Sequence, residues 1–536
     1  MASKRALWGA IAVIIVVIIV FASAYYLTLP KTTQTPTTTV ANVITIGTTD
    51  SISSLDPAKA DDYFSVLVIQ NIFTPLLSYK PGTSVLQPEL ATNIPSTSDG
   101  TISPDGLTYT LYIRQNSKFS DGTPINASTV AYSMNRVIKL GLDPAYLLAP
   151  VANITVPSPY TLQIHLKYPD SAFLQVLALW VTAPVDPKYY TMNGPYTGMP
   201  ITNGHYNVTY WKKGTEIILE RNTNYYGTPA LTQQINIMFY SDATSLKNAI
   251  LTKAVDVGYK DVLPTDIPTL KNQSFLKITS SPGSVIRYIS LNWKDPVIQN
   301  KHVRAAIEYA LNRSYICNNV LYGTAIPLYS MMPTLPFNGY NVYVPSYANL
   351  YGYNQNLAKA KQELALAGYS STNPLTLTLA YTPTHYGLIE QYVAMAIKNQ
   401  IEAIGNVTVN LNPVETPAYW DDLMAGQFQM AMVGWYPDYW DPDDYMATFY
   451  DPAGTPTIGS FYNNSVQHNL TVQEELTINM SKRVQIFQEA QNISAQDIAF
   501  IPLYENNLMV YSLKTVSGIE FDPMLTFQLW VLQKTG

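Results

Sequence analysis

Two short stretches in the first third of the chain alternate apolar and polar residues, which is the pattern of β-strands with one buried face. They are residues 43–48 and 107–113, and the second reads Leu-Thr-Tyr-Thr-Leu-Tyr-Ile. Turn-forming sequences flank the second stretch, at 104–106 (Pro-Asp-Gly) and at 120–124 (Ser-Asp-Gly-Thr-Pro). We therefore expect residues 79–195 to consist of strands, turns and short helices.

A longer pattern in the second half of the chain changes its period twice. Leucines alternate with threonines over 375–379, apolar residues then recur every three to four positions over 389–404, and alternation returns over 407–411. This order predicts a strand, an amphipathic helix that ends at Gly405, and a second strand. A β-α-β unit of this length places its two strands parallel, with a right-handed crossover. Residues 427–435 predict a further strand, so we expect this half to be α/β.

The beginning of the chain differs from the rest in composition. An apolar run covers residues 7–29 and is long enough to span a bilayer once, and two basic residues before it favour the cytoplasmic side for residues 1–6. Residues 30–42 are rich in Pro and Thr and predict an extended linker. The run predicts a transmembrane anchor, and a cleaved signal peptide is the alternative because Ala22-Ser-Ala24 fits a cleavage site. In both cases the remaining chain lies outside the cell.

Charged residues make up only 13% of the 536 residues, and the net charge is −6. Basic residues form no cluster after the first few positions, so nucleic acid is not an expected partner. With so few charges, neutral hydroxyl and amide side chains must provide most of the polar surface. This composition favours the hypothesis that the protein works outside the cell, in acid. Several Asn-x-Ser/Thr sequons, among them Asn126 and Asn406, fit an exterior glycoprotein. The single cysteine, Cys317, excludes a disulfide within the chain and argues against a Cys-ligated metal site.

Sequence motifs of enzymes are absent from the chain. It contains no Gly-x-Ser-x-Gly, His-Glu-x-x-His, Walker or Gly-x-Gly-x-x-Gly motif, and its five histidines are scattered. We therefore expect no catalytic residues, no bound metal and no cofactor. Two rival classes stay open: a cell-surface hydrolase of peptides or glycans, which would release cleavage products, and a structural surface-layer protein, which would bind no ligand.

The most informative segment is 433–445, where aromatic residues, prolines and aspartates follow a predicted strand directly. Ligands of α/β sheets gather at the carboxyl ends of strands. Aromatic rings there are suited to stacking on a ligand, and Asp438 among them can accept hydrogen bonds from an ammonium group or from sugar hydroxyls. The aromatic candidates for ligand binding are Trp435, Tyr436, Tyr439 and Trp440.

Three other interpretations of this segment stay open. The aromatic residues near proline could belong to the core and to a turn. The four aspartates could bind calcium, although the Asp-x-Asp-x-Asp-Gly spacing is absent, or a pair of them could serve glycoside hydrolysis. These aspartates are Asp438, Asp441, Asp443 and Asp444.

Short motifs occur in a characteristic order over almost all of the chain after residue 43. They are Ser54-Leu-Asp-Pro57, Ile72-Phe-Thr-Pro-Leu-Leu77, Lys118-Phe-Ser-Asp-Gly-Thr-Pro124, Arg221-Asn-Thr-Asn-Tyr-Tyr-Gly227, Val303-Arg-Ala-Ala-Ile-Glu-Tyr-Ala-Leu-Asn-Arg313, Gly434-Trp435 with Asp438-Tyr439, and Ile501-Pro-Leu-Tyr-Glu505. Each motif alone is weak, but their order is specific. Together they resemble the family 5 extracellular solute-binding proteins of ABC importers, the oligopeptide, dipeptide and nickel-binding group.

The resemblance implies an α/β fold: a two-lobed, periplasmic-binding-protein-like clamshell (type II) with an extra domain inserted in the first lobe. Lobe I would consist of residues 43–78, 196–285 and 510–536. The inserted domain would be 79–195, and lobe II would be 286–509. The lobes would close over an oligopeptide or dipeptide and deliver it to the ABC permease subunits. The protein would act as a monomer at the extracellular face of the cell membrane, anchored by its N-terminal helix or secreted after signal cleavage.

The resemblance also implies positions in the ligand site. Two stretches of backbone would pair with an extended peptide, namely Gly434 to Tyr436 and Asp61, Asp62 and Tyr63. Asp438 takes the place of the carboxylate that holds the peptide's ammonium group. Met432 stands where oligopeptide binders of the family tend to carry an arginine, so the second anchor is undefined. An oligosaccharide stacked on the aromatic rings stays the alternative ligand, and nickel is not expected because no histidine falls in the motif.

Overall fold

The computed structural model describes residues 42–260, 262–383, 385, 389–416, 418–524 and 527–535. The chain divides into two compact units, Met1–Val40 with Thr535–Gly536, and Ala41–Lys534, and the second unit is described below. The predicted membrane segment 7–29, the residues before it and nearly all of the predicted linker lie outside the described residues. Within the described ranges, no helix is both long enough and apolar enough to cross a membrane.

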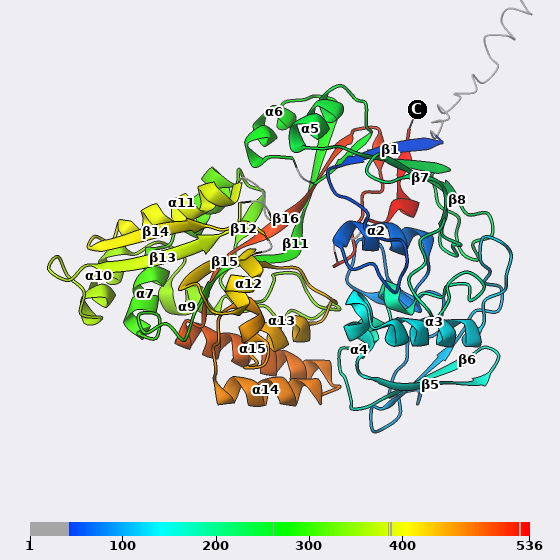
Figure 1. Ribbon diagram of the computed structural model, residues 1–536, viewed down its shortest axis with the longest axis horizontal. Coiled ribbons are helices and arrows are strands. Elements are labelled where there is room, and N and C mark those ends of the chain that lie inside the picture. Colours follow the sequence, from blue (N-terminus) through cyan, green and yellow to red (C-terminus); the bar gives the residue numbers. More distant parts are fainter. Residues whose placement is uncertain are drawn as a thin grey trace, which may run out of the picture. The chain divides into compact units, whose positions relative to one another are not determined.

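Most strands of the second unit belong to one eleven-stranded sheet (Figure 1). They are β1 (Val43–Thr48), β7 (Tyr206–Lys212), β8 (Glu216–Arg221), β9 (Gln234–Phe239), β10 (Val257–Tyr259), β11 (Leu276–Leu291), β12 (Ala325–Pro327), β13 (Leu375–Tyr381), β14 (Val407–Pro413), β15 (Met430–Trp435) and β16 (Phe500–Leu513). The order is β14-β13-β15-β11-β16-β10-β1-β9-β8-β7, and β12 also pairs with β16. β1 is parallel to β9 and β10, and β13 is parallel to β14 and β15.

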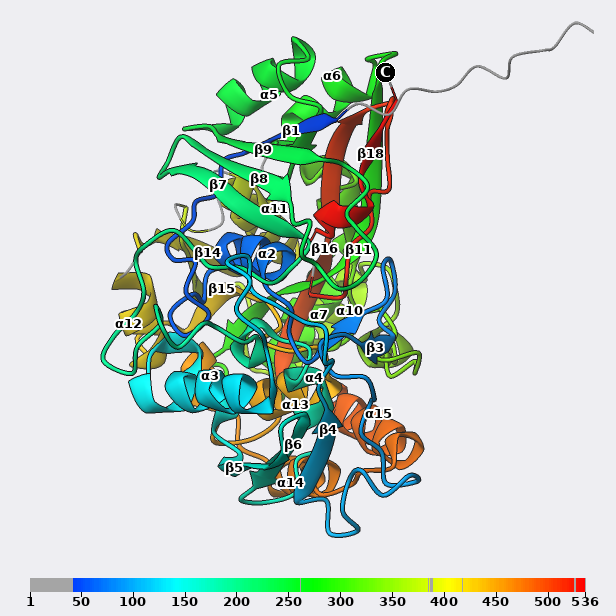
Figure 2. The same ribbon diagram turned by 90° about the vertical axis from the view of Figure 1, so that its right-hand side faces the viewer.

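Two long strands connect the two ends of this sheet (Figure 2). β11 has 16 residues and β16 has 14, and they pair antiparallel along most of their length. β16 lies beside β10 near one end of the pair, whereas near the other end β11 lies beside β15 and β16 beside β12. Their register shifts between Pro282 and Ile286. The pair therefore joins a first strand group, β1 with β7–β10, to a second strand group, β12–β15.

The predicted β-α-β unit is confirmed in the second strand group. β13 and β14 are parallel neighbours, and α11 (Ile389–Glu402) connects them. The helix buries the predicted apolar stripe, including Val393, Ile397 and Ile401. α11 ends at Glu402, three residues before the predicted end, and the turn that follows it includes Gly405, whose φ of 82° is a backbone conformation that glycine adopts without strain. The predicted strand at 427–435 is β15, which is parallel to β13.

A separate three-stranded sheet of order β4-β6-β5 lies in the first third of the chain. Its strands are β4 (Thr108–Tyr112), β5 (Val151–Ser158) and β6 (Thr161–Leu166), and it carries α3 (Ala127–Leu140), η1 (Asp143–Leu148), α4 (Phe173–Val176) and η2 (Trp180–Thr182). We call residues 108–182 the small-sheet segment. Strands and turns were expected here, whereas α3, with 14 residues, is longer than the short helices expected. A capping box of Asn126 and Thr129 starts α3, and Gly141 ends it with a φ of 57°.

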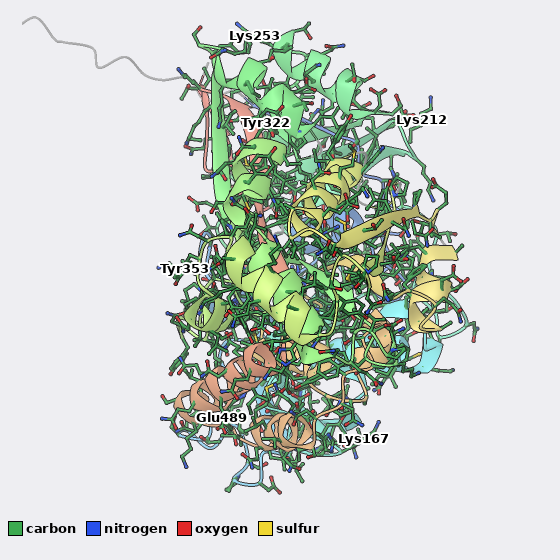
Figure 3. The ribbon with its side chains drawn as sticks, turned by 90° about the vertical axis from the view of Figure 1, so that its left-hand side faces the viewer. Lys167, Lys212, Lys253, Tyr322, Tyr353 and Glu489 are labelled. Atoms are coloured by element: carbon green, nitrogen blue, oxygen red, sulfur yellow. The ribbon has the colours of Figure 1, made fainter. Side chains whose placement is uncertain are left out.

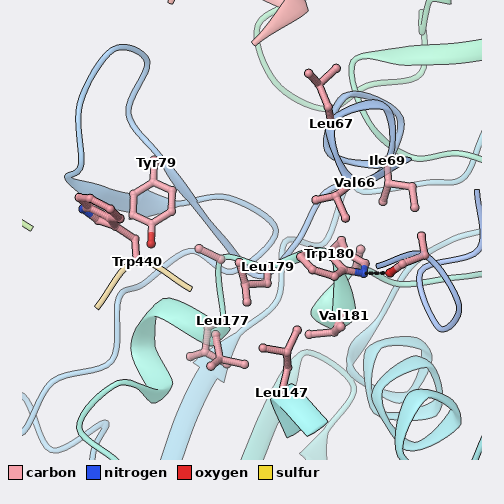
Figure 4. Packing of buried hydrophobic residues seen from close by; sticks show 14 of the residues in the cluster. Val66, Leu67, Ile69, Tyr79, Leu147, Leu177, Leu179, Trp180, Val181 and Trp440 are labelled. Atoms are coloured by element: carbon pink, nitrogen blue, oxygen red, sulfur yellow. Dashed lines mark hydrogen bonds between the residues drawn. The ribbon is translucent and has the colours of Figure 1, made fainter. Parts of the chain in front are cut away.

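The remaining elements pack on these two sheets. α2 (Tyr63–Ile72) packs against the small-sheet segment, where Val66 lies close to Trp180 and the Trp180 indole N–H donates to the Ala60 carbonyl at 2.9 Å (Figure 4). The further helices are α2 (Tyr63–Ile72), α5 (Ala243–Leu251), α6 (Ile267–Lys271), α7 (Lys301–Ala310), α8 (Arg313–Tyr315), α9 (Ser346–Tyr351), α10 (Leu357–Leu366), α12 (Ala418–Met424), α13 (Pro442–Phe449), α14 (Ser465–Glu475) and α15 (Met480–Asp497). Short strand pairs are β2 (Leu77–Tyr79) with β3 (Leu86–Pro88), and β17 (Val516–Ser517) with β18 (Gln533–Lys534).

Charged side chains lie mainly at the surface, as Lys167, Lys253 and Glu489 do in Figure 3. A few ion pairs are buried instead. In one of them, Arg136 of α3 donates to both carboxylate oxygens of Asp56, at 2.8 and 2.6 Å. Because Asp56 belongs to the loop after β1, this pair ties the small-sheet segment to the first strand group.

Candidate functional site

A cavity of about 340 Å³ is lined by α2, the small-sheet segment and the loop after β15. β15 ends at Trp435 and runs parallel to β13, so the cavity lies at the carboxyl end of a parallel strand, the usual place for a ligand in α/β sheets. Its lining includes Asp61, Tyr63, Gln70, Tyr146, Trp180, Lys260, Ser284, His385, Tyr436 and Asp438.

Four of the candidate residues meet in this cavity: Asp61, Tyr63, Tyr436 and Asp438. Tyr63 opens α2, and Tyr436 is the first residue after β15. Their ring centroids are 6.4 Å apart with planes at 57°, so both offer ring surface to the same space. The Tyr63 hydroxyl lies 2.7 Å from the Tyr259 hydroxyl, which fixes the Tyr63 ring on the side of β10. The segments 61–63 and 436–438 are far apart in the sequence, and only the fold brings them together.

Asp438 is the central anionic group of the cavity. Its side chain accepts a hydrogen bond from the hydroxyl of Tyr146, and its backbone N–H donates to Oδ1 of Asp444 at 3.2 Å. Burial raises the pKa of Asp438, and the Tyr146 hydrogen bond opposes that rise. Burial and the charge of Asp438 raise the pKa of the neighbouring Asp444 well above its usual value. Both carboxyl groups therefore hold a proton more readily than a free aspartate does, and a cationic ligand group beside Asp438 would favour its charged form.

Asp61 stands at the exposed rim of the same cavity. Partial burial raises the pKa of its carboxyl group, and the charges of Asp143 and Asp62 raise it further. Asp62 itself does not line the cavity, because its carboxylate caps α2 by accepting the Ser65 N–H at 2.9 Å. The side chains of Asp61 and Asp438 thus give the cavity a negative side.

Lys260 supplies a positive group to the cavity. Its ammonium nitrogen lies 2.9 Å from a carboxylate oxygen of Asp50 and 4.7 Å from the centre of the Tyr63 ring. Lys260 follows β10 directly, so the first strand group positions it. A cation over the face of Tyr63 also favours the ring orientation in which Tyr63 faces Tyr436.

His385 lines the cavity from the second strand group. Its ring packs edge-on against Trp420, with centroids 5.3 Å apart. Burial and the charge of Arg287 lower the pKa of His385, so the imidazole is neutral at neutral pH. Arg287 itself forms a buried ion pair with Glu390, and burial raises the pKa of that carboxyl group to about 7. His385 can therefore donate or accept a hydrogen bond at the cavity without adding charge.

Trp440, a predicted stacking residue, does not line this cavity. It is fully buried: its ring stacks on Phe337 with centroids 4.3 Å apart, and its indole N–H donates to the Pro336 carbonyl at 3.3 Å. Figure 4 places it beside Tyr79. Trp440 therefore belongs to the core, as one of the open interpretations of the aromatic segment expected. A flat aromatic ring packs as well against protein side chains as against a ligand.

Three more candidates are turned toward the protein. The Trp435 indole N–H donates to Asp444 at 2.7 Å, and the Tyr439 hydroxyl donates to Asp443 at 2.6 Å. Gly434 pairs with Arg287 in the ladder between β15 and β11. These residues support the loop that carries Tyr436 and Asp438, and none of them lines the cavity.

The calcium and glycosidase interpretations do not fit these contacts. Asp441 forms a bidentate pair with Arg483, at 2.5 and 3.0 Å, and it also caps α13. Across the described part of the chain, no group of three His, Cys, Asp or Glu side chains is arranged to hold a metal ion. Asp444 accepts the indole N–H of Trp435, and of the four aspartates of this segment only Asp438 lines the cavity.

Sequence reasoning missed several lining residues, among them Tyr146, Lys260 and His385. Tyr146 comes from η1, Lys260 from the end of β10 and His385 from the segment before α11. None of them lies near an aromatic or acidic motif, and no local pattern distinguishes them from surface residues. Their common position becomes visible only when the two strand groups and the small-sheet segment are brought together.

The chain is similar to known binding proteins along most of its length. The "Probable D,D-dipeptide-binding periplasmic protein DdpA" of Escherichia coli is 25% identical over 497 residues, covering 90% of this chain and 92% of that protein. A solved structure of the periplasmic binding protein DppA from Helicobacter pylori in complex with the peptide STSA has a TM-score of 0.74 at 23% identity and covers 92% of this chain and 98% of that one. A dipeptide binding protein from Pseudoalteromonas sp. SM9913 in complex with Met-Leu has a TM-score of 0.75 at 20% identity, with 92% and 100% covered.

The two structural matches establish the mixed α/β, periplasmic-binding-protein-like fold that the sequence motifs implied. Residues 85–457 match the model of the bacterial extracellular solute-binding proteins, family 5, a family of binding proteins and not of enzymes. This match covers more than half of the chain and includes β15 with the loop that carries Asp438. The chain therefore belongs to the bacterial extracellular solute-binding proteins of family 5.

Proposed function

We propose that this protein captures short peptides outside the cell and delivers them, chemically unchanged, to the permease of an ABC importer. The observation that carries the proposal is the half-buried carboxyl group of Asp438, which lines the cavity together with the rings of Tyr63 and Tyr436. A buried carboxylate without a cation is costly, and the α-ammonium group of a peptide would compensate it. The dipeptide- and peptide-binding relatives support the same ligand class.

The cavity favours a ligand of two to four residues. A volume of about 340 Å³ lies at the lower end of small-molecule sites, which span roughly 300–1,000 Å³. The backbone of Gly434–Tyr436 and of Asp61–Tyr63 stays the proposed pairing surface for such a peptide, in the manner of an added strand. Lys260 is a candidate for the second anchor, at the ligand's carboxylate, in place of the arginine that Met432 replaces.

An oligosaccharide is the weaker candidate. Its binding was expected to depend on stacking on Trp435 and Trp440, and neither residue lines the cavity. Tyr63 and Tyr436 leave a smaller stacking surface. The relatives named above supply no argument for a sugar ligand or for hydrolysis.

The domain boundaries implied by the family motifs stay part of the proposal. Lobe I is 43–78, 196–285 and 510–536, the inserted domain is 79–195, and lobe II is 286–509. The first strand group belongs to lobe I, the second to lobe II and the small-sheet segment to the inserted domain. The lobes close by bending of β11 and β16 near their register shift. We further propose that the N-terminal segment, as an anchor or a cleaved signal, places a monomeric protein at the outer face of the membrane.

Thermal unfolding of the purified protein tests the proposal. Di-, tri- and tetrapeptides are compared with the same peptides acetylated at the N-terminus and with oligosaccharides. A ligand at 100 times its dissociation constant adds about 2.7 kcal/mol to the stability of the folded state, which is a visible shift in Tm. We expect free peptides to raise Tm and acetylated peptides to lose the effect. A shift with oligosaccharides alone would reject the peptide ligand but not the family.

A further inference from the structure

The charges that line the peptide cavity are unbalanced. Two carboxyl groups line it, those of Asp61 and Asp438, and Lys260 supplies the one full positive charge among the described lining residues. The Lys260 ammonium already lies 2.9 Å from a carboxylate oxygen of Asp50. A zwitterionic peptide brings one positive and one negative charge. Its α-ammonium at Asp438 therefore leaves Asp61 without a cationic partner on the ligand.

The protein does not supply a cation for Asp61 either. In the described part of the chain, no ion pair joins Asp61 to a basic side chain, and the nearby Lys59 pairs with Asp143 instead. Partial burial and the charges of Asp143 and Asp62 raise the pKa of the Asp61 carboxyl group, as expected for an acid among like charges. A second cation on the ligand would relieve this repulsion.

Asp61 and Asp438 are close enough to contact one and the same ligand residue. Both line a cavity of about 340 Å³, which has room for little more than a short peptide. Tyr146 lies beside both: its hydroxyl donates to Asp438, and burial, the charge of Asp438 and that of Asp61 all raise its pKa. When the α-ammonium of a peptide contacts Asp438, the side chain of that first residue can therefore extend to Asp61.

Two tyrosine rings complete the surroundings of these carboxyl groups. Tyr146 is 52% exposed and Tyr436 is 49% exposed, so both rings offer accessible faces where they line the cavity. A guanidinium group stacks on aromatic rings and donates two parallel hydrogen bonds to a carboxylate. An arginine side chain therefore suits both the rings and Asp61, whereas a lysine side chain supplies the charge without the planar group.

We propose that the cavity selects ligands that carry a second cationic group beside the α-ammonium, namely peptides whose first residue is arginine or, less favourably, lysine. Asp61 is the residue that determines this preference. The proposal rests on the proposed function, with the α-ammonium at Asp438. The guanidinium of the first side chain lies against the tyrosine rings and donates to Asp61 at the rim. Peptides with an acidic first residue are disfavoured, because they add a negative charge beside two carboxyl groups.

Calorimetric titration with Arg-Leu and citrulline-Leu tests the preference. Citrulline has nearly the shape of arginine but no charge, so the ratio of the two dissociation constants isolates the effect of the charge. Because Asp61 lies at the exposed rim, we expect Arg-Leu to bind about threefold to fivefold more tightly at about 0.1 M ionic strength. The ratio should approach one at about 1 M, where salt screens exposed charges. Glu-Leu should bind more weakly than citrulline-Leu.

Asp61→Asn keeps the size of the side chain and removes its charge. It should weaken the binding of Arg-Leu more than that of citrulline-Leu and bring their ratio close to one, whereas a merely structural defect would weaken both equally. Glu489→Gln, at an exposed site on α15, is the matched control and should keep the ratio of the wild type. Equal affinities for the two peptides in the wild type, or an unchanged ratio in Asp61→Asn, would overturn the preference and leave peptide capture intact.

Agmatine separates this preference from the peptide assignment. It is arginine without the carboxyl group, so it carries an ammonium and a guanidinium group at the same spacing and has no peptide bond. If all peptides fail to bind while agmatine binds the wild type more tightly than Asp61→Asn, the peptide ligand is wrong and the preference for a second cation stands. Failure of agmatine together with all peptides would overturn both.

Discussion

The carboxylate of Asp438 is the group on which the peptide assignment depends most directly. Asp438→Asn keeps the size of the side chain and an acceptor for Tyr146, and it removes the charge. Loss of a charge that pairs with a buried ammonium costs about 2–5 kcal/mol of binding free energy. Asp61→Asn, at the exposed rim, should cost less than about 1 kcal/mol. Calorimetry with a free dipeptide measures both, and equal losses in the two variants would remove Asp438 from its role as anchor.

Substitution of Trp440 tests whether this ring belongs to the core or to the ligand site. It is 0% exposed and stacks on Phe337, so Trp440→Ala should leave a cavity and lower the free energy of unfolding by about 3–5 kcal/mol. Urea denaturation measures this loss. Tyr436, which is 49% exposed, offers the opposite case: Tyr436→Ala should weaken ligand binding and change the unfolding free energy by less than about 1 kcal/mol. A stable Trp440→Ala variant with impaired ligand binding would contradict the placement of this ring.

Trp440 and Tyr436 show what could not be predicted from the sequence for single residues. The motif around Asp438 predicts a ligand site because its residue types suit stacking and ion pairing. The same residue types also suit a core, and the sequence does not say which ring turns inward. Tyr146 and Lys260 show the complementary limit, since each reaches the cavity from an element whose own pattern carries no functional signal.

Among the secondary-structure elements, α3 carries a buried ion pair with the loop after β1. Arg136 on this helix is 1% exposed, and its partner Asp56 is 0% exposed. Asp56→Asn leaves a buried cation without its counter-charge, and it should cost about 3–5 kcal/mol of unfolding free energy. Lys59 and Asp143 form a second pair between the same two regions, at 41% and 51% exposure, so Asp143→Asn should leave the free energy of unfolding nearly unchanged. Denaturant unfolding of the two variants, compared side by side, checks the contrast.

Local elements could be predicted where one periodicity held over their whole length. The unit β13-α11-β14 is the clearest case, because alternating leucines, a stripe at helical spacing and Gly405 agree with one another. The pairing of β11 with β16 could not be predicted in this way. Its register depends on partners more than 200 residues apart in the sequence, and its strands serve two strand groups at once. The two-lobed arrangement was therefore expected from the family motifs and not from the periodicity of the sequence.

At the scale of the whole molecule, low overall charge coexists with many buried carboxyl groups. Burial raises the pKa of Glu390 and of Glu505 to about 7, although Glu505 also accepts a hydrogen bond from the Thr334 N–H at 2.7 Å. Burial also raises the pKa of Asp444 and Glu474 well above the usual range. His205 opposes them, because burial lowers its pKa to about 3. The folded chain therefore retains carboxyl protons that the unfolded chain loses.

The pH dependence of stability follows from these raised carboxyl pKa values and from the lowered pKa of His205. A carboxyl group with a raised folded pKa contributes stability that is lost as the pH rises from about 4.5 to about 7. His205 acts in the opposite direction below pH 6.5, but the buried carboxyl groups outnumber it. We expect the free energy of unfolding to be about 2–4 kcal/mol higher at pH 5.5 than at pH 7.5. Glu505→Gln should reduce that difference by about 1–2 kcal/mol. Urea denaturation at both pH values decides: a wild type less stable at pH 5.5 would reject both this balance and the hypothesis of an acidic working environment.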